Sequence, residues 1–307
     1  MKKPFKKFNE DIKLTSNQKE DAKTKYTNVS KTLHKEYYDT EYDGKTKFLF
    51  GSYKTKTNTR PLTEMQDVDV LFKIPQETFD KFDDYESKGQ SALLQEIKEV
   101  LKDTYSTTDK ISAWGKVVLV KMSDNTHNVE VLPALEKDDG TFTIPNSANG
   151  GSWESFDPRK QVDEFQTSND NTNGLTAELG RMMKAWKKNI SSMDYSSYEL
   201  LSDIIAFLET EFTTGAEYEE YHEIVKNFLD YIKTRCNNED RKSYIKTAYN
   251  RAIKGIEYMD DDKPKEASEE WRKIFGDKFP KVEENPKKEQ KKVVPILKPA
   301  SPWSKLG

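Results

Sequence analysis

Two neighbouring stretches decide the fold of this chain: Phe48-Leu49-Phe50-Gly51-Ser52 and Gln66-Asp67-Val68-Asp69-Val70-Leu71-Phe72. The first is a short apolar run that ends in Gly-Ser, and the second is a predicted strand that carries two carboxylates. Successive side chains of a strand point to opposite faces, so Asp67 and Asp69 project together while the apolar residues face a core. Mg²⁺ prefers oxygen ligands and usually takes one or two carboxylates plus phosphates. The pattern therefore predicts a site for a hard divalent cation.

A third carboxylate lies on a later predicted strand, His127-Asn128-Val129-Glu130-Val131-Leu132-Pro133. Glu130 stands between two valines that face the other way, which is the same alternation as around Asp67 and Asp69. Gly-Ser, then Asp-x-Asp, then a single acid on a later strand is the arrangement expected where two Mg²⁺ ions hold a nucleoside triphosphate for attack by a hydroxyl. These motifs indicate a nucleotidyltransferase site in which Asp67, Asp69 and Glu130 are both metal ligands and catalytic residues.

The composition is that of a very polar globular protein. Charged and hydrophobic residues each make up 34% of the 307 residues, a length sufficient for one large or two modest domains. The formal net charge is −4, with 54 acids against 50 bases, so overall charge does not favour a protein that coats nucleic acid. The basic start has no apolar stretch behind it, and no apolar run approaches the ~20 residues that span a bilayer. We therefore expect a cytoplasmic protein without membrane contact.

Cysteine and histidine are scarce, which argues against zinc. Cys236 is the single cysteine, so an internal disulfide and a cysteine-rich zinc site are both excluded. His34, His127 and His222 are far apart and lack metal-ligand spacing. His127 lies three residues before Glu130 on the predicted opposite strand face, so we favour a structural role for it over that of a general base.

Hydrophobic periodicity predicts a mixed α and β first half. Thr15-Ser16-Asn17-Gln18 resembles a capping box and precedes an amphipathic pattern of about 20 residues, so we expect a long helix to open the fold. Strands are predicted at 47–50, 67–74 and 141–144, and a helix around 93–101. Residues 116–122 and 128–132 are predicted to form the two strands of a hairpin whose turn lies at 123–125. The polar segment 53–66 is expected to be a surface loop or a short helix start near phosphates.

The second half has the pattern of a helical bundle. Four apolar stripes recur at helical spacing, beginning at Leu175, Tyr198, Tyr221 and Ile245. Before them, residues 150–174 are rich in Gly, Ser, Asn and Asp, which fits a polar linker and a crossing that lines a cleft equally well. We expect an α+β fold with a nucleotidyltransferase core and N-terminal long helix at 1–165, a helical lobe at 166–280, and a flexible, Lys- and Pro-rich tail at 281–307.

With these motifs in order, the chain resembles the cGAS/DncV-like nucleotidyltransferases, bacterial enzymes that make cyclic oligonucleotide signals in anti-phage (CBASS) defence. The resemblance extends over most of the chain and rests on segments whose order and spacing agree: Gly51-Ser52, 67–70, 129–134, 181–187, 196–199 and 271–280. It implies a polymerase-beta-like mixed-sheet core with a C-terminal helical lobe. It also implies two Mg²⁺ ions and synthesis of a cyclic di- or trinucleotide from NTPs, which are ATP, other NTPs or both, with release of pyrophosphate.

Carried over residue by residue, the resemblance implies that Gly51 and Ser52 hold the donor triphosphate. Lys184 matches a helix lysine that contacts the triphosphate in such enzymes, and Ser197 matches a serine that does likewise. Tyr198 matches an aromatic residue that stacks on a base. The third metal position is Glu130 and departs from the family, where Asp is more usual, and the longer side chain shifts the carboxylate outward.

The residues themselves support two of these roles. Ser196-x-x-Glu199 is a capping box, which places Ser197 in the first turn of a helix, where free N–H groups and the helix dipole favour phosphate. Lys184 lies beside Met183 on an otherwise apolar stripe and can reach inward as a point charge.

Each signal also has an ordinary structural interpretation. A Gly-Ser after a strand is most often a turn, and Asp-x-Asp in an acid-rich chain is most often a solvated strand face. Lys184 alone fits a surface lysine as well as a ligand, and Tyr198 alone fits a core aromatic residue better than a base platform. Glu130 is harder to explain as an ordinary surface acid, because it lies between two valines on a predicted strand.

Other functions stay open from the sequence. One is nucleotidyl transfer to another acceptor, namely a small molecule, a protein hydroxyl or an RNA end, the last disfavoured by the acidic net charge. Another is a catalytically inactive nucleotide-binding scaffold. A sensor of double-stranded DNA is disfavoured, because the zinc-bearing insertion of the animal relatives has no cysteines to build it. Expected partners are NTP substrates, a downstream effector that binds the product, and ubiquitin-like conjugation proteins acting on a tail that ends at Gly307.

Overall fold

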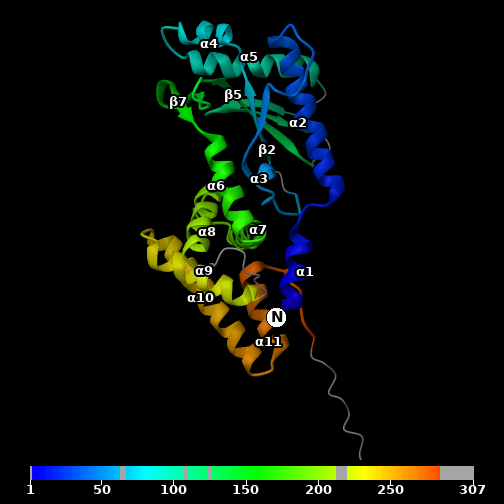
Figure 1. Ribbon diagram of the computed structural model, residues 1–307, viewed down its shortest axis with the longest axis vertical. Helices are drawn as coiled ribbons and strands as arrows, with labels where there is room; N and C mark the ends of the chain where they lie inside the picture. Colours follow the sequence, from blue (N-terminus) through cyan, green and yellow to red (C-terminus); the bar gives the residue numbers. More distant parts are fainter. Residues whose placement is uncertain (1, 63–66, 107–109, 123–125, 212–219, 284–307) are drawn as a thin grey trace, which may run out of the picture.

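A mixed β-sheet forms the centre of the first half of the chain (Figure 1). The computed structural model describes residues 2–62, 67–106, 110–122, 126–211 and 220–283. Within these ranges the strand order is β1-β2-β5-β4-β3, and β6 and β7 extend from the C-terminal part of β5. The strands are β1 (Lys47–Leu49), β2 (Asp67–Lys73), β3 (Lys110–Trp114), β4 (Val117–Lys121), β5 (Asn128–Glu136), β6 (Phe142–Asn146) and β7 (Ser152–Phe156).

The predicted strands are confirmed, and the sheet adds two that the sequence analysis missed, β3 and β7. β4 and β5 pair antiparallel as the predicted hairpin, whose turn at 123–125 lies outside the described residues. β3 pairs with β4 as a further hairpin. Its sequence, Lys-Ile-Ser-Ala-Trp, is too short and too mixed to stand out as a strand.

β2 and β5 pair in parallel, whereas the other named pairs are antiparallel. The register sets Asp67 opposite Asn128 and Asp69 opposite Glu130. Because the side-chain period of a strand is two, the three acids emerge on one face of the sheet, and the valines between them are fully buried on the other. The parallel pairing therefore brings together two motifs whose paired residues are 61 positions apart in the sequence.

Helices α2 (Ser16–Tyr37), α4 (Gln76–Asp83) and α5 (Gly89–Thr104) cover the valine face of the sheet (Figure 1). Leu33 of α2 and Ile97 of α5 are fully buried in one core with the strands. The predicted capping box begins α2, because the Gln18 N–H donates to Thr15 Oγ1 at 3.2 Å and the Thr15 N–H donates to Gln18 Oε1 at 3.0 Å. A short helix, α3 (Gly51–Lys54), follows β1 directly and opens with the Gly-Ser motif.

The predicted helical bundle is confirmed and lies beyond the opposite end of the sheet from α4 and α5 (Figure 1). Its helices are α6 (Pro158–Asn171), α7 (Leu175–Lys188), α8 (Ser197–Glu211), α9 (Tyr221–Arg235), α10 (Glu239–Asp260) and α11 (Pro264–Phe275). The apolar stripes of α7 and α9 are buried throughout, with Trp186, Phe228 and Trp271 among the large side chains of the shared core. α6 leads from the sheet into this lobe.

The chain opens with a helix that the sequence analysis did not anticipate, so the prediction that the long helix opens the fold is wrong. α1 (Lys2–Ile12) precedes it. Phe5 and Phe8 of α1 are fully buried in the helical core, and the Phe5 ring lies 4.9 Å from that of Trp271. Flanking lysines hid the spacing of Phe5, Phe8 and Ile12, which is a helical face. The domain boundary at residue 165 stays a proposal. That division assigns α1 to the nucleotidyltransferase core, whereas α1 packs with the helices of the later lobe.

Residues 150–174 are not an ordinary linker. β7 and α6 occupy most of the segment, and α6 begins with Pro158 as its first residue and with Asp157 as its cap, whose side chain accepts a hydrogen bond from the Lys160 N–H at 2.9 Å. Short polar residues that favour turns also serve as helix caps, so composition misled the linker interpretation.

Two expectations concern the chain as a whole. The predicted flexible tail lies, from residue 284 onward, outside the described residues. Among the helices of the described ranges, none has both the length and the apolar character needed to cross a membrane.

Candidate active site

The three predicted acids line one cavity of about 540 Å³, which we call the cleft. Its walls come from β2, β5 and α3 on one side and from α6, α7 and α8 on the other. The remaining predicted site residues also line it: Gly51, Ser52, Lys184, Ser197 and Tyr198. The fold thus gathers into one cavity all eight residues predicted from motifs and resemblance.

The two aspartates of β2 are positioned by neighbours on other elements. Asp67 Oδ1 accepts a hydrogen bond from Asn128 Nδ2 at 2.9 Å, so the residue beside it in β5 fixes its orientation. The Phe50 N–H donates to the backbone oxygen of Asp69 at 3.4 Å, which anchors the start of α3 against β2. Gly51 follows with a φ of +62°, a conformation that glycine adopts freely.

Burial raises the pKa values of all three acids, and repulsion from neighbouring carboxylates adds to this at Asp69 and Glu130. Burial raises the pKa of Asp69 to about 6, an effect opposed by the Lys184 ammonium and reinforced by Asp67. Burial also raises the pKa of Glu130 to about 7, with added repulsion from Asp67 and Asp69. The pKa of Asp67 is raised by burial too, although the hydrogen bond from Asn128 opposes this. Three carboxylates that repel one another in a partly desolvated wall favour an incoming cation.

The donor set fits Mg²⁺ bound jointly by protein and ligand. All donors are carboxylate oxygens, which suit a hard cation. Within the described residues, no three His, Cys, Asp or Glu side chains already converge as a complete metal-binding group. Asp67, Asp69 and Glu130 would therefore supply part of a coordination sphere, and phosphate oxygens and water would supply the rest, as Mg²⁺ commonly requires.

A cationic wall faces the acids from α7. Lys184 is 8% exposed, and its Nζ donates to Thr57 Oγ1 at 2.8 Å. Burial lowers the pKa of Lys184 to about 8, although the nearby Asp69 opposes this change. One turn later, Lys188 lies at the rim of the cleft, and its Nζ donates to Thr59 Oγ1 at 3.0 Å. The expectation that Lys184 reaches inward is met, and the ordinary surface alternative does not apply.

The loop after α3 takes part in the cleft more closely than the sequence suggested. Thr55, Thr57, Asn58 and Thr59 are all buried, so this part of the predicted surface loop is interior. Residues 63–66 of that loop lie outside the described residues. Neutral hydroxyl groups of this segment accept hydrogen bonds from Lys184 and Lys188. These contacts explain why a polar segment is buried here.

The first turn of α8 brings Ser197 and Tyr198 to the cleft. The predicted capping box is present, because the Glu199 N–H donates to Ser196 Oγ at 3.0 Å and the Ser196 N–H donates to Glu199 Oε2 at 2.9 Å. Ser197 then begins the helix. Tyr198 is 59% exposed, so it is not a core aromatic residue.

The apolar stripe predicted for α8 was partly wrong. That stripe consists of Tyr198, Leu201, Ile204, Ile205 and Leu208. Ile204 and Leu208 enter the core, together with Leu200 and Phe207, whereas Tyr198, Leu201 and Ile205 line the cleft. α8 is apolar on two faces, and periodicity alone cannot tell which one meets a neighbouring helix and which meets a ligand.

His127 has the structural role that was favoured. It is fully buried, and its Nδ1 lies 2.7 Å from Asp21 Oδ2 of α2. Its ring also meets that of Tyr53 edge to face at 5.4 Å. These contacts tie α2 and α3 to the start of β5.

Sequence reasoning did not assign several residues of the cleft to the site: Phe50, Thr55, Asn58, Thr59, Phe156, Gln161, Val162, Glu164, Lys188, Leu201, Ser202 and Ile205. Lys188 carried one usable signal, because it lies one helical turn after Lys184 on the same face. The residues of α6 carried none, since their segment resembled a linker.

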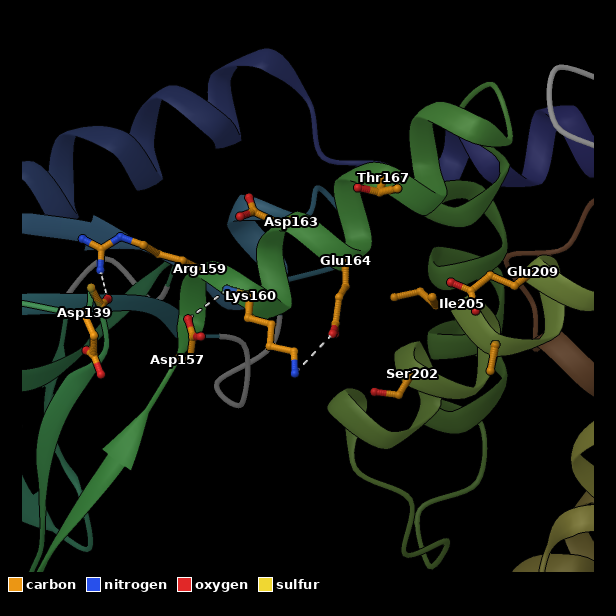
Figure 2. A pocket seen from close by; sticks show the side chains of 12 residues that line it. Asp139, Asp157, Arg159, Lys160, Asp163, Glu164, Thr167, Ser202, Ile205 and Glu209 are labelled. Carbon is orange, nitrogen blue, oxygen red and sulfur yellow. Dashed lines mark hydrogen bonds and ion pairs between the residues drawn. The ribbon is translucent and has the colours of Figure 1, made fainter.

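A second cavity of about 780 Å³ adjoins the cleft between α6 and α8, and we call it the outer cavity (Figure 2). It shares Glu164, Ser202 and Ile205 with the cleft. Acidic side chains outnumber basic ones on its walls, namely Asp139, Asp157, Asp163, Glu164 and Glu209 against Arg159 and Lys160. Arg159 is already engaged by Glu136 and by the Gly140 carbonyl, so its charge is largely neutralised.

The family model of the Second Messenger Oligonucleotide or Dinucleotide Synthetase domain (SMODS) matches residues 1–169, more than half of the chain. The chain belongs to the SMODS family. This SMODS protein is therefore a nucleotidyltransferase, a homologue of cyclic nucleotide synthases. The match covers the sheet that carries the three acids and continues into α6. Lys184 of α7 and Ser197 of α8 lie beyond the matched residues.

Known relatives agree with this assignment. A probable cyclic nucleotide synthase of Bacillus cereus (strain VD146), IK1_05630, is 23% identical and covers 79% of this chain and 85% of its own length. Among solved structures, Escherichia coli MS115-1 CdnC in its HORMA-deltaN complex is 15% identical, with a TM-score of 0.69 over 91% of this chain and 98% of its own. Vibrio cholerae DncV cyclic AMP-GMP synthase, solved with the linear intermediate 5′-pppA(3′,5′)pG, is 14% identical, with a TM-score of 0.69 over 88% and 93%. The SMODS protein thus shares the mixed-sheet core and C-terminal helical lobe of these structures.

Proposed function

We propose that this SMODS protein is a Mg²⁺-dependent synthase that joins NTPs into a cyclic di- or trinucleotide and releases pyrophosphate. The observation that carries the proposal is the cleft itself, where three acids of β2 and β5 face a buried lysine of α7. This is the charge arrangement that a triphosphate with bound cations requires, since anionic and cationic groups meet from opposite walls.

The proposed reaction is in-line transfer between two nucleotides. A ribose hydroxyl of one nucleotide attacks the α-phosphorus of the other, a new P–O bond forms, the bond to the bridging oxygen of the β-phosphate breaks, and pyrophosphate leaves. The hydroxyl proton passes to one of the carboxylates of the cleft. Repetition of the same step within the linear product closes the ring.

The residues of the chain divide this work. Asp67, Asp69 and Glu130 would hold Mg²⁺, which supplies charge neutralisation at the phosphates and lowers the pKa of the attacking hydroxyl. Gly51, Ser52, Lys184 and Ser197 would hold the donor triphosphate, Ser197 at the N-terminus of α8, where the free N–H groups favour an anion.

Tyr198 would stack on a base. Its exposure in the cleft supports this role, because a large aromatic side chain that is 59% exposed has a whole face available for a flat ligand.

A role in anti-phage defence follows from the resemblance to the CBASS synthases and is part of the proposal. We include an effector that binds the product and conjugation of the segment 281–307 by ubiquitin-like proteins. Since the CdnC relative has been solved with a HORMA protein and with ATP, a protein regulator and ATP are reasonable partners here too.

The test is to incubate the purified protein with Mg²⁺ and all four NTPs, treat the mixture with phosphatase, and analyse the surviving nucleotides by mass spectrometry. A phosphatase-resistant oligonucleotide without terminal phosphates is expected. Asp67→Asn should abolish it while the melting temperature stays near that of the wild type, and Asp103→Asn on the exposed face of α5 is the matched control.

The same experiment separates the other functions. Pyrophosphate release without a cyclic product would indicate transfer to another acceptor. Binding of NTP and Mg²⁺ without pyrophosphate release would indicate an inactive scaffold. An active Asp67→Asn protein would contradict the assignment of the metal site.

A further inference from the structure

The part of the cleft that is formed by α6 and α8 is shaped to hold a nucleobase. α6 and α8 face each other there, with Gln161, Val162 and Glu164 from α6 and Leu201, Ser202 and Ile205 from α8. Tyr198 adds an exposed ring at the start of α8. Aliphatic and aromatic walls suit the faces of a flat heterocycle, whereas the polar side chains meet its edges.

Among the described residues that α6 and α8 contribute to the cleft, Glu164 is the charged one. It lines both the cleft and the outer cavity, as does Ser202 on the facing helix. Figure 2 shows the Glu164 side chain leaving α6 in the direction of α8, with its carboxylate near the Lys160 ammonium. The distance from Lys160 Nζ to Glu164 Oε1 is 3.9 Å. Lys160 lines the outer cavity and not the cleft, so a cationic donor lies beside the acceptor at the place where the two cavities adjoin.

This pair of groups matches the Watson–Crick edge of guanine better than any other base edge. Guanine presents two adjacent donors, N1–H and the N2 amino group, beside one acceptor, O6. A carboxylate can accept from both donors at once, and an adjacent ammonium can donate to O6. Adenine and cytosine each present a single donor group on that edge, and uracil presents one N–H between two carbonyls, so none can occupy both carboxylate oxygens.

We propose that Glu164, assisted by Lys160, selects a guanine nucleotide for the base site between α6 and α8. This inference rests on the proposed function, because it assumes that a nucleotide occupies the cleft. It assigns guanine to one of the two substrate positions of the synthase.

The neighbouring acids do not share this role. Asp163 and Glu209 line the outer cavity but not the cleft. Asp163 follows Val162 and precedes Glu164 on α6, so its side chain points about 100° away from that of Glu164 around the helix. Asp163 therefore offers a matched control for a change of charge on the same helix.

The experiment compares the wild type with Glu164→Gln and Asp163→Asn, each as the full chain, in an equimolar mixture of four NTPs with Mg²⁺. Products are digested to nucleosides, and the guanosine content is quantified. A glutamine side chain offers one acceptor and one donor group, which suits adenine rather than guanine. We expect guanosine in the wild-type product, a fall of about tenfold in the ratio of guanosine to adenosine with Glu164→Gln, and no change with Asp163→Asn.

Equilibrium binding of non-hydrolysable GTP and ATP analogues to the same three proteins gives an independent readout. The preference for the GTP analogue should fall by a similar factor in Glu164→Gln. A wild-type product without guanosine, or equal ratios in Glu164→Gln and Asp163→Asn, would overturn the role of Glu164 while the synthase function stands. A Glu164-dependent preference for the GTP analogue in a protein that releases no pyrophosphate would support the base site and overturn the synthase function.

Discussion

Gly51 and Asp69 approach each other so closely that a side chain larger than hydrogen does not fit at position 51. A Cβ atom there would lie 2.2 Å from Asp69 Oδ2 and 2.9 Å from its Cγ. Position 51 therefore requires glycine, because α3 starts directly over the Asp69 carboxylate.

Gly51→Ala should therefore inactivate the protein by displacing the Asp69 carboxylate. We expect pyrophosphate release to fall at least 100-fold, since a shift of about 1 Å in a positioned group costs about that factor. Gly115→Ala is the control, because Gly115 has a similar φ of +55° but no atom within 4 Å of the added Cβ. Equal loss of activity in both variants would show that backbone strain, and not the contact with Asp69, is responsible.

The metal-free protein should lose stability as the pH rises. Folding raises the pKa of Asp69 from 3.8 to about 6 and that of Glu130 from 4.5 to about 7. The folded state therefore binds more protons than the unfolded state between these values, and the free energy of unfolding falls as the pH rises through the interval from 4 to 7.

Glu130→Gln tests this linkage in the presence of EDTA. We expect the free energy of unfolding at pH 8 to rise by about 1 kcal/mol after allowance for solvent screening, with little change at pH 4. Thermal or urea unfolding at several pH values measures it, and Glu86→Gln at an exposed position is the control. Parallel pH profiles for the wild type and Glu130→Gln would contradict the raised pKa.

Lys184→Met should weaken nucleotide binding without unfolding the protein. The variant removes the buried ammonium opposite the acids, and a hydrogen bond to a charged group contributes about 1.5–3 kcal/mol, so we expect the Kd for a non-hydrolysable ATP analogue to rise at least tenfold. Thr57 keeps a partner, because its Oγ1 lies 2.9 Å from Thr55 Oγ1. Calorimetric titration measures the Kd, with Lys187→Met on the same helix as the control. A similar loss in both variants would assign the effect to overall charge.

Tyr198→Ala should raise the KM for NTP about tenfold, because stacking of a base on an aromatic ring is worth about 1–3 kcal/mol. Tyr198→Phe keeps the ring and should behave as the wild type. The melting temperature should change little in either variant, since Tyr198 is 59% exposed. Tyr85→Ala, at another exposed tyrosine, controls for loss of a surface ring. An unchanged KM in Tyr198→Ala would exclude stacking at this position.

Local rules of the chain were enough to predict much of this protein. Alternation in β2 and β5 sets Asp67, Asp69 and Glu130 against buried valines, and the capping boxes at Thr15 and Ser196 mark where α2 and α8 begin. These features depend on residues within four positions of one another, which is the range over which strand and helix periods act. They could therefore be identified before any tertiary contact was known.

Where the prediction failed, long-range packing or competing signals decided the outcome. The lysines around Phe5 and Phe8 hid α1, and the polar residues before Leu175 hid α6, because composition does not record which face of a segment finds a partner. The apolar stripe of α8 was divided between core and cleft for the same reason: Ile204 meets other helices, whereas Ile205 meets the cavity.

The sequence by itself determined the acids, their common strand face, the Gly-Ser motif and the two-part α+β organisation. Only the tertiary structure decided that β2 and β5 are parallel neighbours, that Lys184 binds Thr57 opposite Asp69, and that Glu164 faces α8 across the cleft. The physical reason is that periodicity fixes which way a side chain points from its own element. Which element lies opposite depends on packing between segments tens to more than a hundred residues apart.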